Sequence, residues 1–134
     1  MANQFRCAYA TDKYETTVKF YRDGLGLQID ESWDRSVTDK GTLFKAASGV
    51  IEVVLRSSDE SHGEWENHRP QGFTIVIETD GVDELYERLS GREINIIEGL
   101  KDQKWGHRSF RVSDPNGVSL YFYSEIEVIN NGQD

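Results

Sequence analysis

The stretch KWGHRSFRVSDPNGVSLYFY, residues 104–123, decides how this chain is expected to fold. At its centre, Asp114-Pro115-Asn116-Gly117 has the composition of a type I turn, because proline suits the second position and glycine the fourth. The residues on either side alternate between polar and apolar or form runs of β-branched and aromatic side chains, which is typical of strands. The stretch therefore predicts two strands joined by a tight turn.

Upstream of this hairpin, the same order of elements is predicted twice. Each half reads as a strand, a helix and three further strands, and the helices are expected to begin at Asp12 and Asp80. Both aspartates are followed three residues later by another acidic side chain, a pattern typical of helix N-termini. The strands upstream of the hairpin are expected near residues 5–10, 27–33, 41–47, 49–56, 73–78 and 94–97.

This repetition predicts an α+β fold. Two βαβββ modules would form an open, cup-shaped mixed β-sheet, with one helix backing each module. The length of 134 residues suits a single domain. We expect the first module at about 4–56, a polar loop at 57–71 and the second module at about 72–125.

The charge balance excludes one class of partner. The chain carries 24 acidic and 15 basic residues, for a net charge of −9. Nucleic-acid binding needs a positive surface, so no nucleic-acid partner is expected. A negative field permits a cationic ligand, although excess acid also serves solubility alone.

The remaining bulk features favour a protein of the cytoplasm. Cys7 is the only cysteine, so no internal disulfide is possible, and it is expected to point at the core as an inert thiol. Residues 1–15 hold no apolar run of signal-peptide length, and the longest apolar stretch, at 50–55, is interrupted by Glu52. No membrane association is therefore expected.

Alternation along the strands sorts side chains onto two faces. Apolar members, including Phe5 on the first strand, are expected to pack toward the core. The others would point into the hollow of the cup, among them Arg6, Glu52, Thr74, Tyr121 and Tyr123.

Two motifs resemble those of the vicinal oxygen chelate superfamily, which contains glyoxalases, extradiol dioxygenases and bleomycin-resistance proteins. They are WGxRxFxVxDPxG at residues 105–117 and FYRDGLGL at residues 20–27. The resemblance covers nearly the whole chain and implies the paired βαβββ modules. It specifies the fold more closely than the activity, because one scaffold hosts many chemistries.

The resemblance also allows a check for metal chemistry. Enzymes of this superfamily hold a divalent metal in the hollow with four ligands, and those positions fall on Arg6, Glu52, Thr74 and Tyr121. Only Glu52 is a good ligand, and the guanidinium of Arg6 would repel a dication. We therefore expect no metal, no cofactor and no catalytic residues. His62 and His68 lie in the polar loop, which is a poor frame for a metal.

The hollow instead predicts a binding pocket with aromatic walls and a few polar groups, suited to a cationic or aromatic compound. Trp105 is also open to a purely structural role within the WG motif, and His107 to that of an ordinary polar residue. The residues expected to contact a ligand are Arg6, Glu52, Trp65, Trp105, His107, Tyr121 and Tyr123.

These observations favour a metal-independent small-molecule binding protein. It would resemble the bleomycin-resistance proteins, which are acidic homodimers that sequester an antibiotic unchanged, so a homodimer is expected. One alternative is a metal-dependent lyase, isomerase or dioxygenase of the same superfamily. Another is an accessory dimer with no small ligand, in which side chains fill the hollow.

Overall fold

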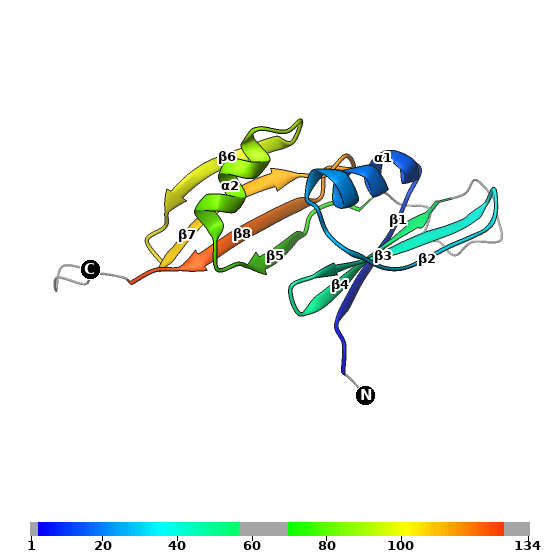
Figure 1. Ribbon diagram of the computed structural model, residues 1–134, viewed down its shortest axis with the longest axis horizontal. Helices are drawn as coiled ribbons and strands as arrows, with labels where there is room; N and C mark the ends of the chain where they lie inside the picture. The colour runs from blue at the N-terminus through cyan, green and yellow to red at the C-terminus, as the bar shows by residue number, and fades with distance from the viewer. Residues whose placement is uncertain (1–2, 57–69, 128–134) are drawn as a thin grey trace.

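The computed structural model describes residues 3–56 and 70–127, which form two four-stranded sheets (Figure 1). The strand order is β1-β4-β3-β2 in the first sheet and β5-β8-β7-β6 in the second. In chain order the elements are β1 (Arg6–Thr11), α1 (Tyr14–Lys19), the π-helical turn η1 (Phe20–Gly24), β2 (Ile29–Ser36), β3 (Asp39–Ala46), β4 (Gly49–Leu55), β5 (Thr74–Glu78), α2 (Val82–Ser90), β6 (Asn95–Asp102), β7 (His107–Ser113) and β8 (Ser119–Glu125).

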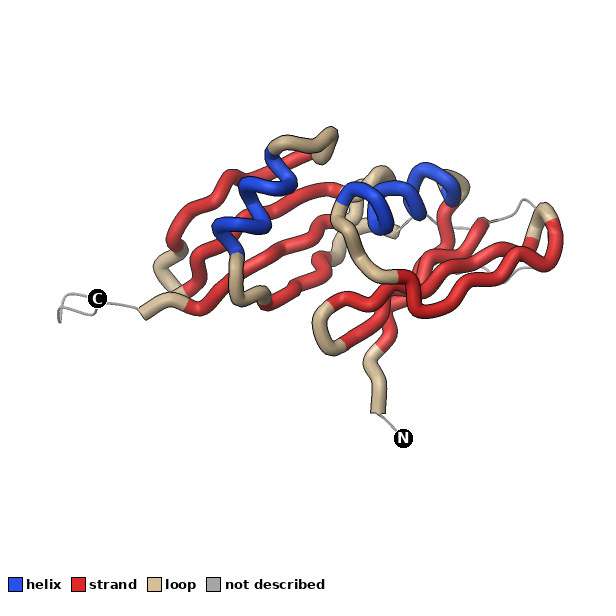
Figure 2. Tube along the Cα trace, viewed as in Figure 1, coloured by secondary structure: helices blue, strands red, loops and turns tan. Residues whose placement is uncertain are grey.

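The two sheets share one topology. In each, the first strand pairs in parallel with the last, β1 with β4 and β5 with β8, and the other pairs are antiparallel. Neither sheet closes into a barrel, and each is accompanied by one helical segment (Figure 2). The expected α+β fold, with its repeated strand-helix-strand-strand-strand order, is confirmed.

The turn between β7 and β8 forms as predicted. The amide of Gly117 donates to the carbonyl of Asp114 over 3.1 Å, which closes a four-residue turn. Gly117 has a φ of +88°, a conformation that side-chain-bearing residues rarely adopt. The carboxylate Oδ1 of Asp114 accepts the amide N–H groups of Asn116 and Val118 at 2.8 and 2.9 Å. One aspartate thus holds both ends of the turn.

The other oxygen of Asp114 joins this turn to the first half of the chain. Asp114 Oδ2 accepts the hydroxyl of Tyr9 on β1 at 2.5 Å and that of Tyr21 on η1 at 2.9 Å. Asn116, two residues on, bonds the side chains of Thr11 and Thr17. Asp114 is 4% exposed, so this carboxylate is buried and fully hydrogen-bonded.

This buried cluster predicts a loss of stability in alkali. Burial, reinforced by the neighbouring Asp114, raises the pKa of Tyr9 and Tyr21 above the ordinary value of 10.0. Stability is therefore unaffected by these groups below pH 10. Above pH 10 the unfolded chain releases protons that the native state keeps, so unfolding free energy falls by about 1.4 kcal/mol per pH unit for each tyrosine.

Urea unfolding at pH 8, 10 and 11 measures this slope. Tyr9→Phe is expected to reduce the slope by about 1.4 kcal/mol per pH unit, whatever its effect on stability at pH 8. An alkaline slope identical in wild type and Tyr9→Phe would show that Tyr9 does not retain its proton.

The helices begin differently from the sequence expectation. Their N-cap residues are Lys13 and Gly81, neither with a side-chain capping bond, so Asp12 and Asp80 do not cap them. Asp12 instead forms a 2.8 Å ion pair with Arg56 at the end of β4. Neither described helix has the length and apolar character needed to cross a membrane.

The core lies between the helices and the sheet faces that they cover. One expectation about it is wrong: Phe5 is 76% exposed, because it precedes β1 and lies at the open edge of the first sheet. Cys7 is half-buried. The largest fully buried side chains belong to both halves and are Tyr21, Leu43, Phe44, Ile51, Leu89, Phe110 and Leu120.

Candidate ligand-binding face

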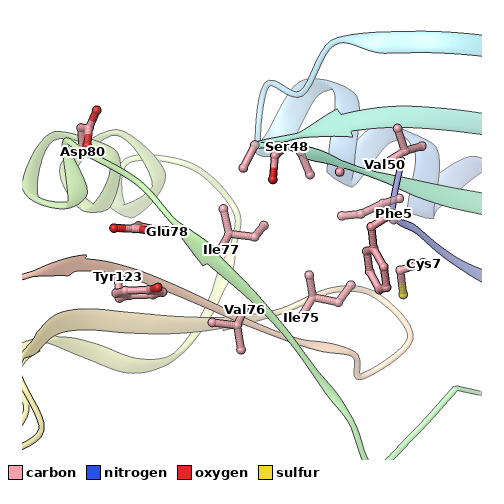
Figure 3. Close-up of a pocket in the computed structure, with 14 residues that line it drawn as sticks. Phe5, Cys7, Ser48, Val50, Ile75, Val76, Ile77, Glu78, Asp80 and Tyr123 are labelled. Atoms are coloured by element: carbon pink, nitrogen blue, oxygen red, sulfur yellow. The ribbon is translucent and has the colours of Figure 1, made fainter. Parts of the chain in front are cut away.

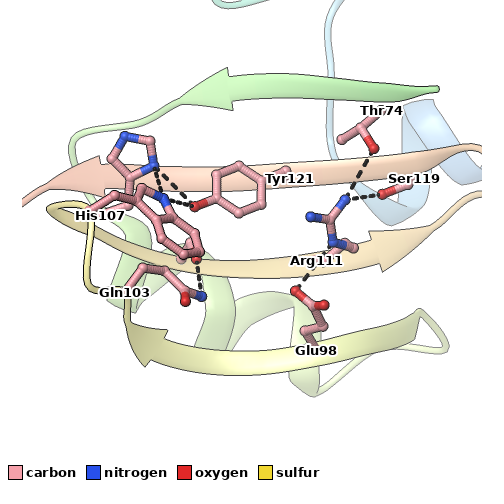
Figure 4. Close-up of polar contacts among 9 residues, drawn as sticks. Thr74, Glu98, Gln103, His107, Arg111, Ser119 and Tyr121 are labelled. Atoms are coloured by element: carbon pink, nitrogen blue, oxygen red, sulfur yellow. Dashed lines mark hydrogen bonds and ion pairs between the residues drawn. The ribbon is translucent and has the colours of Figure 1, made fainter.

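Polar and aromatic side chains gather on the face of the second sheet that points away from α2 (Figure 4). The opposite face packs on α2, where the rings of Tyr86 and Phe110 lie 5.0 Å apart. Strand pairing brings together the side chains on the face that points away from α2. Tyr121 on β8 pairs with Arg111 on β7 and with Val76 on β5. We call this side the open face; its members are Thr74, Glu98, Trp105, His107, Arg111, Ser119, Tyr121 and Tyr123.

Three of the predicted ligand residues form one hydrogen-bonded group on the open face. The indole N–H of Trp105 lies 3.2 Å from His107 Nδ1 and 3.3 Å from the hydroxyl of Tyr121, which is itself 3.0 Å from Nδ1. Whether Nδ1 donates to the Tyr121 hydroxyl or accepts from it depends on the tautomer of the imidazole. Trp105 is 63% exposed and Tyr121 only 7%, so the indole is the accessible part.

Tyr123 extends this group into an aromatic surface. Its ring stacks on the imidazole of His107 with centroids 3.8 Å apart and an angle of 16°, and it lies 5.9 Å from the ring of Tyr121. Desolvation, followed by the negative charge of Glu78, raises the pKa of the Tyr123 phenol. The structure therefore brings together Trp105, His107, Tyr121 and Tyr123.

Arg111 lies at the centre of the open face and was missed in the sequence. Its Nη1 donates to the hydroxyls of Ser119 at 2.6 Å and Thr74 at 3.1 Å, and its Nε to Glu98 at 3.2 Å. Its guanidinium carbon is 5.1 Å from the centre of the Tyr121 ring. The sequence held a usable signal for Arg111, because strand alternation places residues 107, 109 and 111 on one face.

The remaining predicted residues lie elsewhere. Arg6 and Glu52 form an ion pair of 3.2 Å on the first sheet, with side chains 45% and 18% exposed. Within the described residues, neither contacts the aromatic group of the second sheet. Trp65, His62 and His68 lie outside the described residues.

A groove of about 700 Å³ separates the two sheets beside the open face (Figure 3). Phe5 and Cys7 line it from the first sheet, and Ile75 and Val76 from the second, with Tyr123 near one end. This volume suits a drug-sized molecule. Burial raises the pKa of the Cys7 thiol, which disfavours the reactive thiolate at neutral pH.

The residues at the family's metal positions do not fit a divalent metal. Glu52 already pairs with Arg6, and the hydroxyl of Thr74 accepts a hydrogen bond from Arg111. The hydroxyl of Tyr121 is engaged by His107 and Trp105. Across residues 3–56 and 70–127, no three His, Cys, Asp or Glu side chains gather closely enough to hold a metal ion.

Comparison with known proteins assigns the chain to a family. Residues 4–122 match the model of the glyoxalase/bleomycin resistance protein/dioxygenase superfamily. The chain is 37% identical over 124 residues to the bleomycin resistance proteins of Geobacillus stearothermophilus and Staphylococcus aureus, covering 83% of this chain and 88% of each relative. The chain therefore belongs to the glyoxalase/bleomycin resistance protein/dioxygenase superfamily.

Solved structures show the same fold at lower sequence identity. TioX from Micromonospora sp. ML1 superposes with a TM-score of 0.74 at 16% identity, covering 93% of this chain and all of TioX. TnmS3, described as an antibiotic binding protein from Streptomyces sp. CB03234, has a TM-score of 0.68 at 19% identity, covering 93% of this chain and 97% of its own. These likenesses establish a shared fold.

Proposed function

We propose that this protein binds an aromatic small molecule on the open face and sequesters it unchanged, as a resistance protein acting in the cytoplasm. The observation that carries this proposal is the joined set of Trp105, His107, Tyr121 and Tyr123, beside a groove of about 700 Å³. Aromatic walls with a few fixed polar groups are the usual makeup of a small-molecule site. The names of the bleomycin resistance relatives support the same role.

The aromatic part of the expected ligand has better structural support than the cationic part. Glu52 was the expected contact for a cation, but Arg6 compensates its charge at 3.2 Å. The rings of His107 and Tyr123 offer stacking surface whatever the charge of the ligand.

A second copy of the chain would complete the site. The groove is bordered by exposed apolar side chains, including Phe5 at 76% and Val76 at 58% exposure. A partner that covered them would shield both the groove and its ligand from water. Sedimentation equilibrium is expected to show a homodimer, and a monomer at micromolar concentration would contradict this part of the proposal.

Binding and chemical fate can be tested in one experiment. Titration calorimetry with bleomycin and with a panel of aromatic antibiotics is expected to find a ligand with a one-to-one stoichiometry per site. The ligand recovered after denaturing the protein should have its original mass. A ligand recovered with an altered mass would favour an enzyme instead.

Metal analysis tests the alternative of a metal-dependent lyase, isomerase or dioxygenase. After incubation with nickel, zinc, iron and manganese followed by desalting, we expect no stoichiometric metal by mass spectrometry. The reason is that Glu52 is the only carboxylate at the family's metal positions and is paired with a cation. One tightly held metal per chain would overturn the metal-independent function.

A further inference from the structure

The hydrogen bonds of Arg111 leave one edge of its guanidinium open. A guanidinium carries N–H groups on Nε, Nη1 and Nη2, in a rigid planar fork. Nε faces Glu98, and both hydrogen-bonded hydroxyls, of Ser119 and Thr74, lie on Nη1. Among the described residues no acceptor bonds Nη2, and Figure 4 shows this nitrogen on the side of Tyr121 without a partner.

The open edge is held in a fixed position. Three polar partners, on β5, β6 and β8, restrain the guanidinium, and the ring of Tyr121 lies beneath it at 5.1 Å from the centroid. The Arg111 side chain is 27% exposed, so the fork is partly shielded from water but accessible. A donor that is already oriented loses little entropy when it binds an acceptor.

A second nitrogen without a partner among the described residues lies along the same face. Nδ1 of His107 is bonded by Trp105 and Tyr121, which leaves Nε2 to donate a hydrogen when the ring carries its proton there. No described residue accepts that hydrogen. The unbonded nitrogens of Arg111 and His107 therefore belong to side chains on either side of Tyr121 (Figure 4).

We propose that the Nη2 edge of Arg111 is an anion subsite, which binds a carboxylate carried by the aromatic ligand of the open face. This inference rests on the proposed function and specifies its ligand as an aromatic acid. With Nε and Nη1 already bonded, Nη2 can donate to a carboxylate oxygen, and such charge-assisted hydrogen bonds are about twice as strong as neutral ones.

The acidic groups nearby do not remove this preference. Glu98 pairs with Nε at 3.2 Å and offsets part of the charge of Arg111, but its side chain is 49% exposed to solvent and it leaves the hydrogens of Nη2 unbonded. Glu78 pairs in register with Tyr123, beyond Tyr121 from the guanidinium. The overall charge of −9 acts from the surface, where salt screens it beyond about 8–10 Å.

Three probes with one ring system separate the contributions. We would measure the binding of 2-naphthoate, 2-naphthamide and 2-(aminomethyl)naphthalene, which are anionic, neutral and cationic, to the full-length protein by calorimetry. We expect 2-naphthoate to bind at least about tenfold more tightly than the amide, from the charge-assisted contact. That advantage should shrink as salt is raised from 20 to 500 mM.

Variants on one strand provide the matched comparison. Arg111→Gln should abolish the preference for naphthoate over naphthamide, measured as the ratio of the two dissociation constants within the variant. Arg108→Gln is the control, because Arg108 lies on the same strand but points to the opposite face, where it pairs with Asp83 and Asp102. It should keep the wild-type preference. Circular dichroism melting checks that both variants fold.

The outcomes distinguish this subsite from the proposed function. If wild-type protein binds all three probes equally, or binds the cationic probe most tightly, the anion subsite is wrong while an aromatic ligand face stands. If none of the probes binds at millimolar concentration, the open face is not an aromatic site and both proposals fail. If Arg111→Gln does not fold, the probe ranking and its salt dependence in the wild type decide.

Discussion

Replacing Asp114 with alanine is expected to lower the unfolding free energy by about 3–5 kcal/mol, which is enough to unfold many domains of this size. The carboxylate accepts two tyrosine hydroxyls and two backbone amides, and alanine leaves those donors without it. Tyr9 and Tyr21 are buried at 5% and 0% exposure, so water cannot easily replace the lost partner. Urea unfolding at pH 7 measures the loss.

Asp102→Ala is the matched control. Its carboxylate pairs with Arg108 at the surface and its side chain is 62% exposed, so its removal should cost less than about 1 kcal/mol. Asp114→Asn, which preserves the shape and one acceptor oxygen, should fall between the two. A loss at Asp114→Ala no larger than at Asp102→Ala would show that the turn does not depend on its connection to β1 and η1.

Replacing Tyr123 with alanine is expected to weaken the binding of the aromatic ligand by about 10–100-fold. The phenol ring stacks on His107 and lies at the end of the groove, so its removal takes away contact area and leaves the imidazole uncovered. Calorimetry with the ligand identified by the antibiotic panel, or with 2-naphthoate, measures the change. Tyr121→Ala is a poorer test, because Tyr121 is 7% exposed and its loss would also destabilise the sheet.

Two further variants control this result. Tyr123→Phe should bind normally, since no described residue forms a hydrogen bond with the Tyr123 hydroxyl. Phe73→Ala removes an aromatic side chain that is 38% exposed and does not line the groove, so it should leave affinity unchanged. Equal losses at Tyr123→Ala and Phe73→Ala would place the ligand away from the open face.

Local patterns were sufficient to predict the elements of the fold. The turn at residues 114–117 follows from the preferences of proline and glycine, and the structure closes it with the expected backbone hydrogen bond. Alternation correctly placed Tyr121 and Tyr123 opposite Leu120 and Phe122, because side chains of a strand alternate strictly. Such signals are carried by neighbouring residues, so no knowledge of the tertiary structure was needed.

The helix starts and the first strand show where local patterns failed. Asp12 is of a residue type that commonly caps helices, but its carboxylate pairs with Arg56, which is distant in the sequence. A guanidinium is a stronger partner for a carboxylate than a single backbone amide. Phe5 continues an apolar alternation, yet no element covers it, and it is 76% exposed. Whether an apolar side chain is buried depends on what packs over it, and that is a property of the whole fold.

The sequence by itself determined the strand and helix order, the α+β class and the two faces of each strand, because period and turn chemistry act over a few residues. Only the tertiary structure decided that Asp114 accepts hydroxyls from Tyr9 and Tyr21, about a hundred residues away. It also decided that Arg111 lies within the aromatic face while Arg6 and Glu52 pair on the other sheet. The contacts of Asp114 depend on how the two halves of the chain meet, and the others depend on which strands pair within each sheet, so alternation along one strand carries no information about either.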